Sequence, residues 1–350
     1  MKHFIMSFLV TALCLALAGA WGYRHGGSAA LFSAVGLALM LGIMEVSLSF
    51  DNAVVNASVL KGWNLFWQRL FLGLGILVAV FGMRLLFPLV IAAATADLGI
   101  GDVWTMALRE PDRYAAHLTS HHAQVAVFGG VFLLLVFLNF LFDEDKEVHW
   151  LGHVERKLGS FGRIAALPVL LSLGAVLACA SLAGGQKLAV LSAGVWGVLT
   201  YVGVDALGSL LEKEEESRAD AGRIVKQGGI GGFIYLEVLD ASFSFDGVIG
   251  AFAMTKDVVI IMLGLAIGAM FVRSLTVYLV RQGTLEEFVF LEHGAHYAIG
   301  ALALIMLASL KYHVPEIVTG LTGVAFILAS LWASVLHKRN SESHGGKLAI

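Results

Sequence analysis

Long apolar runs separated by short polar stretches form the hydrophobicity pattern of this chain. A run of about 20 mostly apolar residues is long enough to cross a hydrocarbon core of about 30 Å. Ten such runs are present, and the stretches between them leave no room for a soluble domain. The pattern therefore predicts an all-α polytopic membrane protein with about ten transmembrane helices in one membrane domain, residues 1–350. The predicted spans cover roughly residues 4–22, 29–60, 65–95, 123–142, 163–183, 188–210, 230–254, 257–281, 294–311 and 316–337.

Composition points to the same class of protein. Of the 350 residues, 58% are hydrophobic and 14% are charged, whereas soluble globular proteins have about 45–50% and about 25%. A water-soluble fold is therefore excluded, and the lipid bilayer is the expected partner. The formal net charge of −3, without a basic tract, gives no reason to expect nucleic acid as a partner.

The distribution of basic residues predicts the orientation. Ten spans place both termini on the same side of the membrane. Fifteen Lys and Arg residues fall in loops on that side, six fall on the other side, and Arg84 and Arg273 lie within spans. The positive-inside rule therefore places both termini in the cytoplasm. Residues 1–22 also fit a cleaved signal peptide, and their removal would leave the orientation of the other spans unchanged.

An acidic motif occurs twice. Residues 45–52 read EVSLSFDN and residues 240–247 read DASFSFDG. The first acid, both Ser, the Phe that precedes the second acid, and the second acid itself align in register. Such a match between the second and the seventh span indicates an internal duplication.

Further matches follow the motif in the later spans of each half. Arg84 aligns with Arg273, and His122 aligns with His293. The matched spans are five apart, an odd number, so the two halves must cross the membrane in opposite directions. Inverted repeats of this kind build secondary transporters, with the substrate site near the bilayer midplane. The predicted repeat cores are residues 29–142 and 230–312.

Five carboxylates lie near the middle of two predicted spans. An ionised carboxylate at the bilayer centre costs at least about 2.5–3.5 kcal/mol, so a counter-charge is required. Arg84 and Arg273 balance two of the charges, and a divalent cation with one or two protons would balance the rest. Two alternatives to a metal site remain. The acids could serve only to hold the helices together through the arginines, or the site could bind an organic cation and couple its movement to protons. The five acids are Glu45, Asp51, Glu237, Asp240 and Asp246.

Helical phase separates the two acids of each motif. Asp51 lies on a stripe about 120° from that of Glu45, and six residues of helix rise about 9 Å. A continuous helix therefore cannot present both side chains to one ion. Either the helix unwinds around residues 47–51, or each carboxylate pairs with one from the other half, and the same holds for Asp240 and Asp246. The Glu45 stripe also holds Ser49, Asn52 and Asn56, and the hydroxyls expected to assist the ligands are those of Ser47, Ser49, Ser242 and Ser244.

Histidines gather near the ends of two matched spans. His122 lies at the predicted outer end of the fourth span, and His293 and His296 lie at the predicted inner end of the ninth. These corresponding positions suggest gates, although interfacial histidines that face water are the more common case. Glu292 shares a helix face with His296, but the order of residues does not match the His-Glu-x-x-His pattern of zinc proteases.

The two acidic motifs, residues 45–52 and 240–246, resemble those of the TerC family of integral membrane proteins. The similarity covers roughly residues 29–312 and is greatest to a branch with a domain of unassigned function. It implies a multi-pass protein of the bacterial inner (cell) membrane, linked to tellurium resistance and, in some members, to manganese efflux and metal ion homeostasis. The chain departs from the family at position 247, where it has Gly and the family commonly has Ser. It also has an additional acid, Glu237. The metal-site residues implied by the resemblance are Glu45, Asp51, Asn52, Asp240 and Asp246.

The sequence thus predicts a transporter that exports a divalent cation by alternating access, coupled to protons. Mn²⁺ is the favoured substrate, and Ca²⁺ or Mg²⁺ is possible. Glu237 would carry the proton, and Arg84 and Arg273 would balance the charge of the empty site. The alternative is a non-transporting scaffold that docks soluble partners in a tellurium or metal stress-response complex, for which the short loops offer little area. No complete catalytic constellation is present, so we expect no enzymatic activity; a homo-oligomer remains open.

Overall fold

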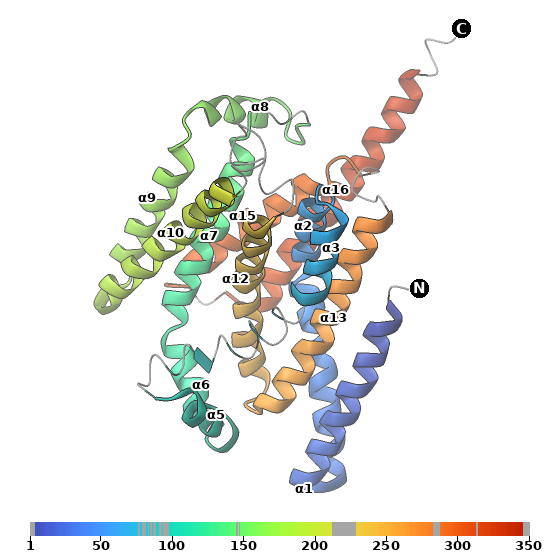
Figure 1. Ribbon diagram of the computed structural model, residues 1–350, viewed down its shortest axis with the longest axis vertical. Coiled ribbons are helices and arrows are strands. Elements are labelled where there is room, and N and C mark those ends of the chain that lie inside the picture. The colour runs from blue at the N-terminus through green and yellow to red at the C-terminus, as the bar shows by residue number, and fades with distance from the viewer. Residues whose placement is uncertain are drawn as a thin grey trace.

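The computed structural model contains helices as its only regular elements within the residues that it describes, which confirms the all-α prediction (Figure 1). The described residues are 4–75, 98–144, 146, 148–211, 229–282, 288–312 and 314–345, together with positions 78, 82, 84, 86, 89, 90 and 93.

The first helix, α1 (Ile5–Leu48), is a hairpin of two arms. The chain leaves helical geometry at Gly26 and Gly27, and Gly27 has a φ of 68°, which favours glycine. The arms fold back on each other so closely that a Cβ atom on Gly22 would lie 2.7 Å from the Cβ of Ala34. The two arms coincide with the first predicted span and the start of the second.

The second arm of α1 is interrupted at Ser49 and continues as α2 (Phe50–Leu60). The interruption lies inside the segment 47–51 in which unwinding was one of the two alternatives. A short helix, α3 (Leu65–Leu70), and a π-helical turn, η2 (Phe71–Gly75), follow. Most of the predicted third span, 65–95, lies outside the described residues.

The remaining helices form the rest of the bundle. Two short amphipathic helices precede α7, and α8 crosses the end of the bundle before α9. These elements are α5 (Ile100–Arg109), α6 (Pro111–Ser120), α7 (His122–Leu141), α8 (His153–Gly159), η4 (Ser160–Arg163), α9 (Leu167–Leu182), η5 (Gly184–Gln186), α10 (Lys187–Leu211), α12 (Ile230–Met254), α13 (Val258–Gln282), α15 (Leu291–Ala308) and α16 (Glu316–Gly345).

Six helices in the described part of the chain are long and apolar enough to cross a membrane. A seventh arises if α8 and α9, which meet at a bend of 99°, form one broken span. The 25-residue helix α12 carries three acids, which lower its apolarity. The structure therefore supports a membrane protein, whereas the count of ten spans stays a prediction. The six are Ile5–Leu48, His122–Leu141, Gly184–Ala206, Val258–Gln282, Leu291–Ala308 and Val318–Arg339.

Contacts between helices fix their relative directions. The residue Trp63, just after α2, meets the start of α12, because a Cβ on Gly232 would lie 2.8 Å from its ring. Earlier in α2, Asn56 contacts Asp240, later in α12, so these helices are antiparallel. Helices α7 and α15 are antiparallel too, since Gly129 approaches Met306 whereas Phe140 stacks on His296. In Figure 1, α8 and the end of α16 lie at one end of the molecule, and α5, α6 and the turn of α1 lie at the other.

Candidate functional site

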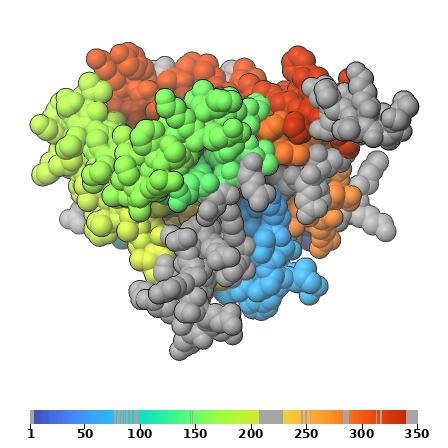
Figure 2. All heavy atoms as spheres, turned by 90° about the horizontal axis from the view of Figure 1, so that it is seen from above, coloured from blue at the N-terminus to red at the C-terminus, as the bar shows by residue number. Residues whose placement is uncertain are grey.

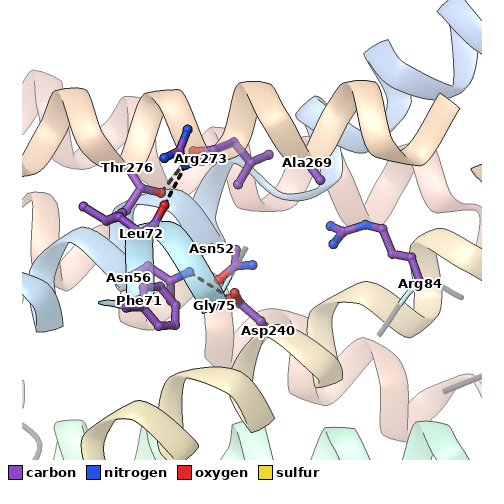
Figure 3. A pocket seen from close by; sticks show the side chains of 11 residues that line it. Asn52, Asn56, Phe71, Leu72, Gly75, Arg84, Asp240, Ala269, Arg273 and Thr276 are labelled. Atoms are coloured by element: carbon purple, nitrogen blue, oxygen red, sulfur yellow. Dashed lines mark hydrogen bonds between the residues drawn. The ribbon is translucent and has the colours of Figure 1, made fainter. Parts of the chain in front are cut away.

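A cavity of about 40 Å³ lies between α2, η2, α12 and α13 (Figure 3). A buried water needs about 10–15 Å³ on this measure, so the cavity has room for an ion with a few waters. Both predicted repeats contribute to its walls. The lining residues are Asn52, Asn56, Phe71, Leu72, Gly75, Arg84, Asp240, Ala269, Val272, Arg273 and Thr276.

One wall of the cavity joins two asparagines to one carboxylate. Asn56 Nδ2 donates a hydrogen bond of 2.8 Å to Asp240 Oδ1, and the side chain of Asn52 lies beside the same carboxylate (Figure 3). All three side chains are buried, with Asp240 7% exposed. The Oδ1 atoms of Asn52 and Asn56 are buried and have no hydrogen-bond donor among the described residues. Two amide oxygens are therefore left as free acceptors beside a carboxylate.

Glu45 reaches the same region from the last turn of α1. Its Oε1 forms a buried ion pair with Arg84 and accepts a hydrogen bond of 2.8 Å from Ser49 Oγ. Two glycines make room for this carboxylate, because a Cβ on Gly268 would overlap the Glu45 side chain and a Cβ on Gly247 would lie 2.7 Å from its Oε2. The predicted charge balance by an arginine is thus present for Glu45.

The second arginine has a different partner from the one predicted. Arg273 Nε donates a hydrogen bond of 2.8 Å to the backbone carbonyl of Leu72, in the π-helical turn (Figure 3). π-Helical turns are rare and are frequent at functional sites. Arg273 therefore fixes the turn that forms one wall of the cavity. The partner is a main-chain atom, which a charge pattern cannot reveal.

Asp51, the second acid of the first motif, does not line the cavity. Asp51 is buried on another face of α2 and lies against Gly323 of α16, where a Cβ would lie 3.1 Å from Asp51 Oδ2. Glu45 and Asp51 thus face different neighbours, as the helical phase predicted. Asp246 belongs to α12, which is continuous through the motif, but its side chain is outside the described residues.

Glu237 lies one turn before Asp240 on α12. Its carboxyl group is 7% exposed, and neither oxygen has a hydrogen-bond partner among the described residues. It approaches the π-helical turn, because a Cβ on Gly75 would lie 2.7 Å from its Oε1. Glu237 is therefore a second buried acid beside the cavity, without the donors that Asp240 has.

The four predicted serine hydroxyls divide into two groups. Ser49 contacts Glu45, and Ser244 Oγ is buried without a partner in the described part of the chain. Ser47 is exposed and donates to Ile43 O, and Ser242 donates to Val238 O on its own helix. Only Ser49 is therefore seen next to a predicted ligand.

The predicted gate residues lie away from the cavity. His122 begins α7 at the end opposite to His293 and His296, which contact Phe140 near the other end of that helix. His296 stacks on the Phe140 ring at 4.0 Å, and Glu292 forms an ion pair of 3.1 Å with Lys61. The opposite placement agrees with the prediction, whereas a role as gates stays a prediction.

Within the described residues, no group of three or more His, Cys, Asp and Glu side chains lies together as a metal site. The acidic and amide side chains that line the cavity are one carboxylate, Asp240, and two amides, Asn52 and Asn56. Sequence reasoning placed Asn56 on the polar stripe but did not name it as a site residue, and it missed Thr276, which also lines the cavity. Periodicity could have found Asn56, because it shares the face of Glu45, Ser49 and Asn52.

Comparison with known proteins gives a family but no activity. No curated protein and no solved structure matches the chain. One family model matches residues 50–341, which include the cavity and most of the helices. The TerC resemblance is not tested by this match and stays a prediction. The chain belongs to the DUF475 family of proteins of unknown function.

Proposed function

We propose that this chain exports a divalent metal cation, with Mn²⁺ favoured, by proton-coupled alternating access between two inverted repeats. The observation that carries the proposal is the pair of buried amide oxygens beside Asp240, on Asn52 and Asn56, which have no donor among the residues that the structure describes. A buried acceptor without a donor is unfavourable unless a ligand satisfies it. A cation supplies what these oxygens lack.

The chemistry of the oxygens favours a hard divalent ion. Carboxylate and amide oxygens suit Mg²⁺, Ca²⁺ and Mn²⁺, whereas thiolates and imidazoles suit Cu⁺ and Zn²⁺. Asp240 supplies one charge at the cavity, Glu45 supplies a second charge next to the lining residue Arg84, and Asn52 and Asn56 supply neutral oxygens. In the ion-free form, Arg84 neutralises Glu45. An entering cation would compete with this guanidinium, so release of Arg84 would accompany binding.

The directions of the helices support the inverted repeat. The matched pairs α2 and α12, and α7 and α15, are each antiparallel. The cavity has one wall from α2 and another from α12 and α13. A rocking movement of one repeat against the other would open such a cavity first to one side and then to the other.

Asp51 and Glu237 take separate roles in this proposal. Asp51 faces α16 rather than the cavity, so it would meet the ion only after α2 has moved relative to α12. Glu237 is buried without a donor, and burial of an unpaired charge is costly, so it would hold a proton while the site is empty. Ion binding one turn away at Asp240 would release that proton.

The chemistry of the site and the resemblance to the TerC family support a role in metal ion homeostasis. The proposal places the protein in the bacterial inner membrane with both termini in the cytoplasm. Lys146, Arg156, Lys157 and Arg163 belong to the end of the molecule that carries α8, as the positive-inside rule expects for the cytoplasmic side.

The first test measures cellular metal after a Mn²⁺ load, with the wild type and Asp240→Asn expressed to equal levels. We expect the wild type to lower cellular manganese and Asp240→Asn to lose this effect, because it removes charge at constant size. Asp102→Asn is the matched control, since Asp102 is an exposed acid on α5. Equal manganese with wild type and Asp240→Asn would contradict the proposal.

A second test uses purified protein in liposomes. Mn²⁺ flux and internal pH are followed together, and Mg²⁺ and Ca²⁺ are added as competitors. We expect Mn²⁺ movement to be matched by opposite movement of protons. Flux of Mn²⁺ without any pH change would leave export in place but remove the coupling.

A further inference from the structure

A cluster of charged side chains is buried where the segment between α7 and α8 meets α15, away from the cavity. Glu155 of α8 is 0% exposed and forms an ion pair of 2.8 Å with Lys146. Its other carboxylate oxygen accepts a hydrogen bond of 3.1 Å from Leu151 N–H. Lys146 also donates to Phe140 O at 2.9 Å, on the last turn of α7. Glu155 and Lys146 therefore neutralise each other inside the protein.

His293, in the first turn of α15, contacts this pair through one ring nitrogen. Its Nε2 lies 2.9 Å from Val148 O and 3.4 Å from Glu155 Oε1. Because a carbonyl oxygen can only accept, Nε2 carries the proton in the neutral ring. The other nitrogen, Nδ1, is buried and has no hydrogen-bond partner in the described part of the chain. The neutral ring thus holds the segment on α15.

A second proton on His293 would disturb this arrangement. It would go to Nδ1, which would become a buried donor without an acceptor, an unfavourable state. It would also add a positive charge beside Lys146. Attraction to Glu155 Oε1, which lies 3.4 Å from Nε2, offsets part of this cost but gives no acceptor to the new N–H on Nδ1. Acidification therefore favours a ring that has moved out to water.

The other titratable groups near the ring have partners or positions of their own. Glu292 pairs with Lys61 of α2 at 3.1 Å, and the ring of His296 stacks on Phe140. No hydrogen bond is seen from Nδ1 of His293 to either Glu292 or His296. Helix α16 contributes the neutral side chains of Ser330 and Ser334 near the start of α15. His149, of the same segment, and Tyr297, of α15, each have a buried polar atom that lacks a partner among the described residues. His337 of α16 lies on the other side of the Phe290 ring, which separates it from His293.

Glu155 keeps its charge over the pH range in which histidine titrates. Burial alone raises the pKa of its carboxyl, but the Lys146 ammonium and the Leu151 N–H outweigh burial and hold that pKa below its usual range. The stabilisation that Glu155 provides is therefore present at neutral pH and is lost only in more acidic solution, as pH falls through its lowered pKa. Histidine is the side chain that changes charge between about pH 5 and 8.

We propose that Lys146, Glu155 and His293 form a proton-operated latch, which holds α8 on α15 at neutral pH and releases it when His293 is protonated. Helix α15 is also tied to the end of α2 by the Lys61–Glu292 pair. The latch therefore connects α8 to the helix that carries Asn52 and Asn56. Figure 2 looks onto this end of the molecule, where green atoms around α8 lie beside red atoms of α16.

The test is a fluorescence anisotropy titration of the purified full-length protein in lipid nanodiscs, without added metal. Cys14 and Cys179 are replaced by Ser, and Val154, which is 60% exposed on α8, is replaced by Cys and labelled with a pH-insensitive dye. We expect anisotropy to be lower at about pH 5 than at about pH 7.5, with the fall below the usual histidine pKa of about 6.5, because the latched state disfavours the second proton. His293→Gln keeps a donor for Val148 O but does not titrate, so it should lose this response.

His153→Gln is the matched control, because His153 lies on the same helix with an exposed side chain and should keep the full response. Equal anisotropy of the wild type at both pH values overturns the latch, and so does a normal response in His293→Gln. If His293→Gln does not fold, the wild-type titration decides alone: a fall with a midpoint in the histidine range supports the latch and a flat curve rejects it. Since no metal is present, the outcome is independent of whether the chain exports Mn²⁺.

Discussion

Asn56 donates its side-chain N–H to Asp240 across 184 residues of sequence, at 2.8 Å. This hydrogen bond joins α2, in the first predicted repeat, to α12, in the second. It also turns the amide so that its oxygen is left without a donor in the described part of the chain. One asparagine thus connects the two halves and offers an acceptor to the cavity.

Asn56→Leu should weaken Mn²⁺ binding by at least about tenfold. The change removes both the donor to Asp240 and the free oxygen, and about 1.4 kcal/mol corresponds to tenfold in affinity. Isothermal titration of the purified protein with Mn²⁺ measures the effect. Asn139→Leu is the matched control, because Asn139 only donates to Leu135 O on its own helix, and it should bind Mn²⁺ as the wild type does.

Arg84→Ala should destabilise the metal-free protein by about 3–5 kcal/mol, because it leaves the buried Glu45 without its cation. Arg84→Lys keeps a positive charge and should cost less. Thermal unfolding in detergent compares the two variants. Coincident melting curves of the Ala and Lys variants would argue against charge balance. Combining Arg84→Ala with Glu45→Gln should recover part of the lost stability.

Gly268→Ala should destabilise the protein by about 1–3 kcal/mol, as overpacking of a well-packed interior does. The new Cβ would overlap the side chain of Glu45 and displace it from Arg84. Gly36→Ala is the control: no atom lies within 4 Å of its would-be Cβ, and alanine favours helix by about 1 kcal/mol. A Gly268→Ala protein that melts with the wild type would show that α13 is not tightly packed on Glu45.

Mn²⁺ affinity should rise with pH, because carboxylates must lose protons before they bind a metal. If Glu237 is the group that releases the proton, Glu237→Gln should reduce the number of protons released per bound Mn²⁺ by about one. Titrations in buffers of different ionisation enthalpy give the number of protons released. An unchanged number in Glu237→Gln would assign the proton to another acid.

Asp51→Asn and Asp246→Asn should each abolish Mn²⁺ export while the protein remains inserted. Because Asp51 lies against Gly323 and not in the cavity, its replacement should change the affinity of the resting state by less than about threefold. Flux in liposomes and binding to purified protein separate the two effects. Loss of binding equal to that of Asp240→Asn would mean that Asp51 is a ligand in the resting state.

Part of the site could be predicted from the sequence because few arrangements satisfy the charges. Glu45 and Asp51 are six residues apart, so helical phase required either an interruption or separate partners. The structure has both in the first half, with the break at Ser49, whereas α12 runs on without one. Arg84 and Arg273 were the only Lys or Arg residues far from the ends of the predicted spans, and Arg84 indeed pairs with Glu45.

The rest depends on contacts that leave no periodic signal. Arg273 bonds to a main-chain carbonyl, and any residue at position 72 supplies one. Glu155 lies in what reads as a charged loop, yet it is fully buried by the fold of the segment around Lys146. The count of ten spans relied on hydrophobicity and on the distribution of basic residues, whereas six helices in the described residues are long and apolar enough to stand as spans.

The bond between Asn56 and Asp240 also has a consequence for how the protein is made. The donor enters the membrane long before the ribosome reaches the acceptor, 184 residues later. Until then, the amides of Asn52 and Asn56 face a bilayer that offers them no partner, a state that membranes tolerate poorly. We therefore expect the cavity to close only after α12 is inserted. Chains that terminate early would display unsatisfied amides, by which a membrane protease could distinguish unfinished copies from finished ones.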